Sequence, residues 1–229
     1  MRALRGLLVI VLVLGGIFVV LDRTLLYFAE SEAEDRIRIP GATVESADVS
    51  INGFPFLTQA LASQFDEVDV EITGIQTDSN GRRIRVSRMS AALHDVKLTE
   101  GFSGVTAADA DGKAVISYDD LTSTAGDGVA VEYGGNGKVK VTGTVDVLGR
   151  PFSRSVLSTV TLVDGQTLRV RADKVPGGGI PGLEDLVRRK TDFERQVGGL
   201  PSGLELRKIQ VTDEGVEVMV AGTNVKLAG

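Results

Sequence analysis

The sequence predicts an α+β fold in which an antiparallel β-sheet, built as a meander of hairpins, is combined with one long amphipathic helix and preceded by an N-terminal membrane helix. Three observations support this prediction. Apolar and polar residues alternate over many short segments, turn motifs join several of these segments, and an unbroken apolar run lies near the start of the chain. The chain has 229 residues, 42% of them hydrophobic, so it is long enough to bury a sizeable core.

The N-terminal segment contains Arg2 and Arg5, followed by an apolar run over residues 6–21. As a helix this run spans roughly 24 Å, slightly less than the ~30 Å hydrocarbon core, and snorkelling side chains or local thinning of the bilayer close the difference. A cleaved signal peptide is the alternative. Asp22 and Arg23 follow the run in place of a small-residue cleavage site, which favours an uncleaved signal anchor.

This reading predicts three parts: a transmembrane helix over residues 1–23, a helical stalk over 24–40 and a β-rich domain over 41–229. Because Arg2 and Arg5 lie on the short N-terminal side, the positive-inside rule predicts a single-pass protein of the cell membrane with its C-terminal domain on the extracytoplasmic side. The whole chain has 25 basic and 31 acidic residues, and the part after Arg23 has a net charge of −8. Such an acidic surface argues against nucleic acid as a partner, and contact of the domain with a membrane must be apolar and local.

Strands are predicted wherever apolar residues alternate with polar ones. The alternating pairs and triplets are Val49 and Ile51; Val68, Val70 and Ile72; Ile84 and Val86; Val96 and Leu98. Three turns, at residues 134–137, 164–165 and 213–215, contain Gly with Asn or Asp and predict β-hairpins.

Two helices are predicted within the β-rich domain. After Pro55, Leu57, Ala60, Leu61 and Phe65 fall on one helical face, with Thr58, Gln59, Ser63 and Asp66 opposite. A longer amphipathic helix is predicted from Pro181 to Val197, with Leu183, Leu186, Val187, Phe193 and Val197 on its apolar side. The segment Ala114–Ala125 fits either a helix or a strand.

Motifs that carry chemistry are scarce. The chain has one histidine and no cysteine, which argues against transition-metal sites, Cys-His catalysis and a disulfide framework. His94 is interpreted as an ordinary strand residue, and "ADADGK" as a solvated turn rather than a calcium loop. Gly177, Gly179 and Gly182 match a dinucleotide-binding pattern, but the charged segment before them is unlike the buried first strand of such a fold. We therefore expect no enzymatic activity and no cofactor.

The stretch "SINGFPFLTQALASQF" contains Phe54, Phe56 and Phe65 in a chain that has only eight phenylalanines. They either plug the end of a sheet or line an apolar mouth that takes up acyl chains or dips into a bilayer. The candidate lipid-binding residues are Phe54, Phe56, Leu57, Leu61, Phe65, Leu183, Leu186 and Val187.

The order of features resembles the actinobacterial LmeA-like family: an N-terminal membrane segment, "VSINGFPFLTQALASQFDEVDVEI", "ISYDDL", the glycine-rich hairpin, "GRPFSRSVLSTVTLVDGQTLRV" and "LELRKIQVTDEGVEVMVAG". This resemblance implies a phospholipid-binding protein of the cell envelope, linked in mycobacteria to maturation of mannosylated lipids. It also implies a TULIP-like fold, in which a strongly curved antiparallel sheet wraps around a long amphipathic helix. No catalytic residues follow from it.

The leading hypothesis is a membrane-anchored, outward-facing protein that binds phospholipid or a related envelope lipid, with acyl chains in an apolar groove between the sheet and the helix near residues 183–197. Transfer of lipid is a further possibility within this hypothesis. The alternative is a non-enzymatic structural or adaptor module that binds another envelope protein through a sheet edge or an apolar patch.

Overall fold

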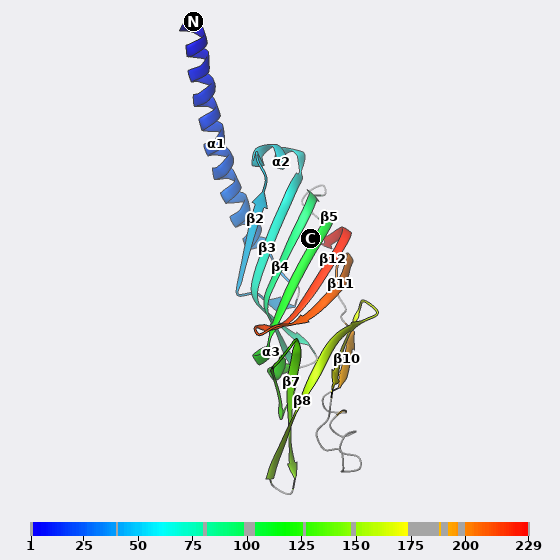
Figure 1. The fold of residues 1–229 in the computed structure, drawn as a ribbon. Coiled ribbons are helices and arrows are strands. Elements are labelled where there is room, and N and C mark those ends of the chain that lie inside the picture. Colours follow the sequence, from blue (N-terminus) through cyan, green and yellow to red (C-terminus); the bar gives the residue numbers. More distant parts are fainter. Residues whose placement is uncertain are drawn as a thin grey trace.

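Two antiparallel sheets make up most of the folded part of the chain, and one long helix precedes them (Figure 1). The structure, a computed structural model, describes residues 2–39, 41–79, 82–98, 104–125, 127–147, 150–173, 188, 192–196 and 200–228. Helix α1 covers Arg2–Arg36 and contains the whole apolar run. The predicted α+β class, with an N-terminal apolar helix followed by antiparallel β-structure, is confirmed.

The large sheet has seven strands in the order β1-β3-β4-β5-β12-β11, with β2 also paired to β3. All its pairings are antiparallel. Its strands are β1 (Ala42–Thr43), β2 (Ser46–Asn52), β3 (Gln64–Ser79), β4 (Arg82–Leu98), β5 (Gly104–Ser117), β11 (Ser202–Val211) and β12 (Gly215–Ala228). The alternation at residues 84–86 and the alternation at residues 96–98 thus belong to one 17-residue strand.

The small sheet has five strands in the order β10-β9-β8-β7-β6. They are β6 (Val129–Gly135), β7 (Lys138–Val147), β8 (Arg150–Val163), β9 (Thr167–Ala172) and β10 (Phe193–Gln196). The three predicted hairpins are confirmed, because β6 pairs with β7, β8 with β9 and β11 with β12 across the predicted turns. Asn136 and Asp164 have positive φ there, as tight hairpin turns require.

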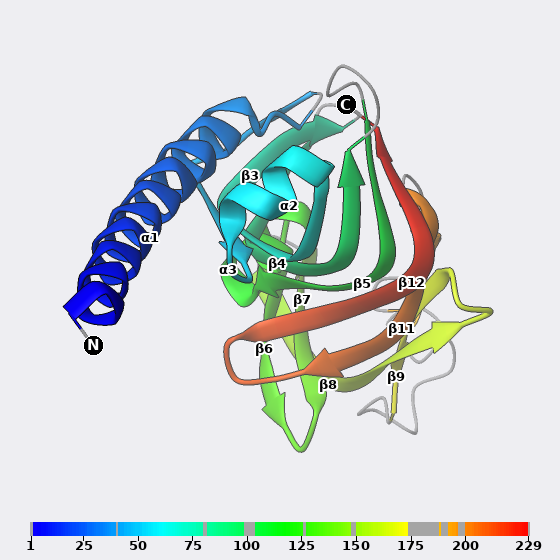
Figure 2. The same cartoon turned by 90° about the horizontal axis from the view of Figure 1, so that it is seen from above.

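Two short helices accompany the sheets. Helix α2 (Phe56–Ala62) lies across the end of the large sheet beside α1, as both views show (Figures 1 and 2). Helix α3 (Tyr118–Ala125) follows β5 directly. The segment Ala114–Ala125, which fits a helix or a strand by sequence, is therefore a strand up to Ser117 and a helix after it.

Two clusters of buried apolar residues form the core. The first cluster lies at the α2 end of the large sheet and comprises Leu93, Val96, Ala107, Ala110 and Val225. The second joins the small sheet to the β11–β12 hairpin and comprises Val139, Val141, Val156, Ala172, Val211 and Val216. Tyr118 and Leu121 of α3 pack against the second cluster.

Two predictions of local structure are wrong. Residues 193–196, assigned to the end of a helix from Pro181 to Val197, form strand β10, which pairs antiparallel with β9. A helical hydrogen bond from the Asp192 N–H to the Arg188 carbonyl precedes this strand. Arg188 is helical, and the rest of the predicted helix, Asp192 apart, lies outside the described residues, so the wrapping of a sheet around it stays a prediction. The "ADADGK" segment is not a turn but the middle of β5, paired on both sides.

Candidate functional site

The contact between α1 and α2 centres on Asp22, which directly follows the apolar run. Its side chain has no exposed surface, and its carboxylate accepts hydrogen bonds from the backbone N–H groups of Leu57, at 2.8 Å, and Phe56. The first N–H groups of a helix have no partner within the helix. Pro55 at the N-cap offers no side-chain acceptor, so Asp22 supplies the cap from another helix.

The loop before α2 is held by Gln59, a buried residue. Its side chain accepts from the Asp66 N–H at 2.8 Å and donates to the Asn52 carbonyl at 3.3 Å, which connects the two ends of the α2 segment. Gly53 has a φ of 102°, and a Cβ there would lie 2.5 Å from the Gln59 amide nitrogen. Only glycine combines this backbone conformation with that contact.

The five predicted site residues in this region have different environments. Phe56 is 6% exposed and stacks on Phe65, with ring centroids 6.2 Å apart, and Phe65 packs against the first core cluster. Phe54 is 59% exposed and lies under the Arg23 guanidinium, 5.1 Å from its ring centroid. Leu61 is 87% exposed, and Leu57 is half-buried.

The structure differs from the periodicity at Gln59. Leu61, assigned to the apolar face, is exposed, whereas Gln59, assigned to the polar face, is buried. The helix also ends at Ala62, because Ser63 is left-handed and the chain enters β3 at Gln64. Periodicity alone does not predict the burial of Gln59, because its amide accepts from one backbone N–H and donates to one backbone carbonyl, which offsets the cost of burying it. The other three candidates, Leu183, Leu186 and Val187, lie outside the described residues.

The second half of α1 packs along the outer edge of β2. The carboxylate of Glu30 accepts from the Ile51 N–H at 2.8 Å, and that of Glu34 accepts from the Val49 N–H at 3.2 Å. Since β2 pairs with β3 on its other side, these two N–H groups point away from the sheet. The helix that begins as the apolar segment therefore covers an edge strand and is attached to the domain over several turns.

One face of the large sheet carries an apolar strip between the two core clusters. We define the apolar strip by two rows of cross-strand neighbours, Val70, Ala91, Gly112 and Val220 in one row and Ile72, Met89, Ala114 and Val218 in the next. Directly paired residues point to the same face. Ile72 is buried, whereas the other seven are only half-buried in the described part of the chain.

The apolar strip is continuous with both clusters. On β12, Val216 belongs to the second cluster, Val218 and Val220 belong to the strip, and Val225 belongs to the first cluster. The opposite face at the same level is charged, with Asp69 and Glu71 on β3 and Asp111 and Lys113 on β5. Three positions in the strip are Ala or Gly, and the Val220 side chain lies against Gly112. This geometry suits an apolar ligand that lies along the sheet.

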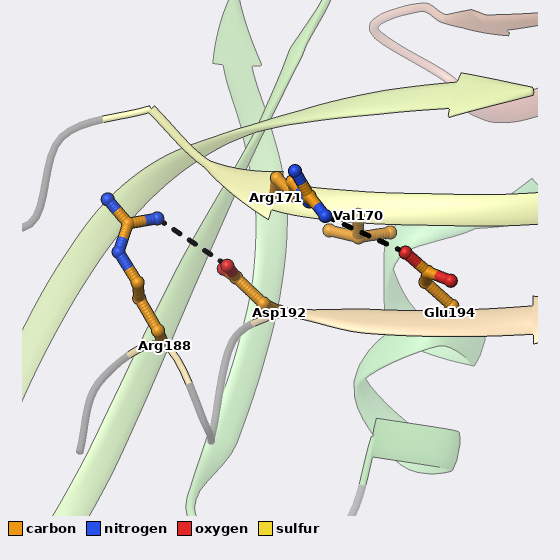
Figure 3. Close-up of a pocket in the computed structure, with 5 residues that line it drawn as sticks. All are labelled: Val170, Arg171, Arg188, Asp192 and Glu194. Atoms are coloured by element: carbon orange, nitrogen blue, oxygen red, sulfur yellow. Dashed lines mark hydrogen bonds and ion pairs between the residues drawn. The ribbon is translucent and has the colours of Figure 1, made fainter. Parts of the chain in front are cut away.

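A depression of about 440 Å³ lies beside β9 and β10 (Figure 3). It is lined by Val170 and by the charged residues Arg171, Arg188, Asp192 and Glu194. Arg188 pairs with Asp192 at 3.5 Å, and Arg171 with Glu194 at 3.8 Å. Four of its five lining residues are charged, so this depression is unsuited to acyl chains.

The interpretation of His94 as a strand residue is confirmed, since it lies in β4 opposite Glu67 and Asp109. Among the described residues, no group of three or more His, Asp or Glu side chains is placed to hold a metal ion. The glycines of the dinucleotide-like pattern lie outside the described residues, but the strand before them, β9, is antiparallel to both its neighbours. A dinucleotide fold requires a parallel strand there, which supports the rejection of that motif.

The family model described as LmeA-like phospholipid-binding matches residues 20–221. The chain belongs to this family. Comparisons with curated proteins and with solved structures found no match. The match begins at residue 20, so it includes Asp22 and the part of α1 that packs on the domain, and α1 is a candidate membrane anchor by length and composition.

Several residues of the site were not identified from the sequence. Asp22 is a single acid at the end of an apolar run, which indicates a specific partner, but the sequence does not show that this partner is α2. Val218 and Val220 alternate visibly in "VEVMVAG", but the sequence does not show that they share a face with Ala91 and Met89. That relation depends on strand register, which long-range pairing sets.

Proposed function

We propose that this protein is a membrane-anchored, non-enzymatic phospholipid-binding protein of the bacterial cell envelope, and that acyl chains lie on the apolar strip of the large sheet. In this proposal residues 1–23 form the membrane anchor, and the folded domain is extracytoplasmic. Membership of a phospholipid-binding family supports the ligand class. The observation that carries the location is the half-buried apolar strip between two fully formed core clusters.

The energetics favour an occupant on this strip. Removing apolar surface from water contributes roughly 25 cal/mol of binding free energy for each Å² that a ligand covers. An acyl chain that covers two rows of residues would therefore bind with several kcal/mol of favourable free energy. The charged depression near β9 offers no comparable apolar area. Delivery of the bound lipid to another membrane or protein is the finer form of the proposal.

Two adjacent alanines provide a matched test. Ala91 lies on the apolar strip, whereas Ala92 lies on the charged face opposite Asp69 and Asp111, and both are half-buried. Ala91→Gln places an amide without partners in the path of an acyl chain, whereas Ala92→Gln places it on a solvated surface. We expect Ala91→Gln to lower the bound phospholipid per protein about tenfold and Ala92→Gln to leave it near the wild-type value.

The measurement is native mass spectrometry of the full-length protein, with lipid extraction and circular dichroism melting of the same samples. Equal lipid content in both folded variants would place the ligand elsewhere. A wild-type protein without phospholipid, together with a stable envelope protein in a pull-down, would favour the adaptor function instead.

A further inference from the structure

The tip of the domain around α2, residues 53–62, lacks charge and exposes apolar side chains. Between Asp48 and Asp66 the sequence contains no acidic or basic residue, although 24% of the whole chain is charged. Phe54 and Leu61 are 59% and 87% exposed at this tip. An apolar surface of this kind, on an otherwise acidic domain, is typical of a contact site.

The tip is fixed at a defined level of α1. The Asp22 carboxylate binds the first N–H groups of α2, and Asp22 directly follows the apolar run. The side chains of residues 7–14 in that run are at least half exposed, and this part of α1 extends past α2 and away from the sheets (Figure 1). If the apolar run over residues 6–21 spans the bilayer, it covers about 24 Å, and Asp22 lies where the hydrocarbon ends.

Neighbouring side chains match the interface of a bilayer. Arg23 stacks on Phe54 and is partly exposed, as expected for a cation at the level of the headgroups. Tyr27 and Phe28, 70% and 62% exposed, follow within two turns of α1, and aromatic residues are enriched at this depth. The α2 tip and these side chains therefore lie within one interfacial layer.

We propose that the α2 tip is immersed in the outer interface of the bilayer that α1 spans, with Phe54 and Leu61 in contact with lipid. Asp22 sets this depth, because it connects the end of the membrane segment directly to the start of α2. Phe56 stacks on Phe65 at the first cluster, so the immersed tip adjoins the apolar face on which lipid is proposed to bind. The inference rests on the proposed membrane anchor and deepens the proposed lipid binding.

Single cysteine labels test the proposal cleanly, because the chain contains no cysteine. The full-length variants Leu61→Cys, Val13→Cys, Val218→Cys and Leu157→Cys carry an environment-sensitive fluorophore in phosphatidylcholine nanodiscs. Part of the lipid bears a nitroxide quencher on its acyl chain. Val13 reports on the membrane segment, Val218 on the apolar strip and Leu157, which is 42% exposed on β8, on a surface far from the tip.

We expect quenching at position 61 to approach that at position 13 and to exceed that at position 157 at least about threefold. Asp22→Ala should reduce quenching at position 61 while quenching at position 13 stays unchanged. Quenching at position 13 without quenching at position 61 would overturn the immersion of the tip and leave the anchor intact. Absence of quenching at position 13 would overturn the anchor itself, and with it the proposed depth.

Lipid bound to the protein must be distinguished from the bilayer. The same labelled protein, loaded with nitroxide lipid and transferred into amphipol, retains bound lipid but has no bilayer. We expect position 61 to lose its quenching there, whereas position 218 keeps it if lipid occupies the apolar strip. Persistent quenching at position 61 in amphipol would show that the label reports bound lipid, and would overturn contact of the tip with the bilayer.

Discussion

At the scale of single residues, Asp22 connects the apolar segment to the folded domain. Its carboxylate is an acceptor for α2, and it pairs with Arg23 at 3.1 Å. Replacement by Ala leaves the first N–H groups of α2 without an acceptor, and loss of a cap destabilises a helix. We expect Asp22→Ala to lower the melting temperature by about 2–5 °C and Asp22→Asn to lower it less, because an amide oxygen still accepts.

Glu32→Ala is the matched control for Asp22, because Glu32 is an acid of the same helix whose pair with Arg36 is exposed. Exposed pairs contribute little to stability, so this variant should melt within about 1 °C of the wild type. Circular dichroism of the full-length proteins in detergent gives all three values. Equal melting of Asp22→Ala and Glu32→Ala would show that α2 does not depend on its cap.

The two phenylalanines that flank Pro55 have different roles. Phe56 is buried against Phe65, so Phe56→Ala should cost about 3–5 kcal/mol of unfolding free energy, the usual range for a buried ring. Phe54 is mostly exposed and loses only its contact with Arg23, so Phe54→Ala should cost less than about 1 kcal/mol. Chemical denaturation distinguishes the two, and equal costs would contradict the difference in burial.

Tyr118 gives a prediction in the alkaline range. Burial, with contributions from Tyr133 and Asp213, raises its pKa to about 12, and its hydroxyl donates to the Thr212 carbonyl. Because the folded pKa lies above the unfolded value of about 10, the stability from this group is fully present below pH 10 and is lost as pH rises toward 12. The phenolate absorbance difference between wild type and Tyr118→Phe should therefore titrate near 12. A midpoint near 10 would contradict the burial.

Individual residues also show where sequence patterns fail. The inward-facing residues of the first cluster are three apart on neighbouring strands, Leu93 and Val96 on β4, and Ala107 and Ala110 on β5. Simple alternation would place each pair on opposite faces. Asp95, between Leu93 and Val96, has a positive φ, and this interrupts the alternation of side chains so that Leu93 and Val96 face the same cluster. Nothing in the sequence "ALHDVKL" predicts a positive φ at Asp95, although Asp adopts positive φ more readily than most residues.

At the scale of secondary structure, two hydrogen bonds connect side chains of α1 to the backbone of the edge strand β2. The Val49 and Ile51 N–H groups donate to Glu34 and Glu30 and have no strand beyond them in the described part of the chain. The double variant Glu30→Ala, Glu34→Ala should speed hydrogen exchange of these two amides at least about tenfold, because they lose their acceptors. Glu32→Ala is again the control. Unchanged exchange would indicate that the edge is protected without the helix.

The elements that the sequence predicts best are those determined locally. Each of the three hairpins is confirmed because Gly with Asn or Asp in a tight turn leaves few alternatives. Residues 193–196 form a strand despite helical periodicity, because β10 gains its hydrogen bonds from β9, about 25 residues earlier. Such long-range pairing outweighs the weak helical preference of a short segment. The apolar strip was not predicted for the same reason, since it exists only once four strands are in register.

At the scale of the whole molecule, the contacts of α1 bear on whether the N-terminal segment is retained. A mature N-terminus between Arg23 and Ser31 would remove Asp22 from α2, and one at Ser31 would also remove Glu30 from β2. The family match also begins before this range, at residue 20. A segment with several specific contacts to the domain is expected to remain part of the mature protein.

The orientation of the protein in the membrane follows from the charges that flank its apolar run. Arg2 and Arg5 precede the apolar run, so the N-terminus should stay in the cytoplasm and the whole domain should be exported. A reporter that is active only outside the membrane, fused after Gly229, should be active, and Arg2→Glu with Arg5→Glu should reduce that activity. Mass spectrometry of the purified protein should find the intact N-terminal segment. An inactive fusion would reverse the orientation. An active fusion with a mature N-terminus between Arg23 and Ser31 would replace the anchor with a signal peptide and would leave α2 without its acceptor on α1.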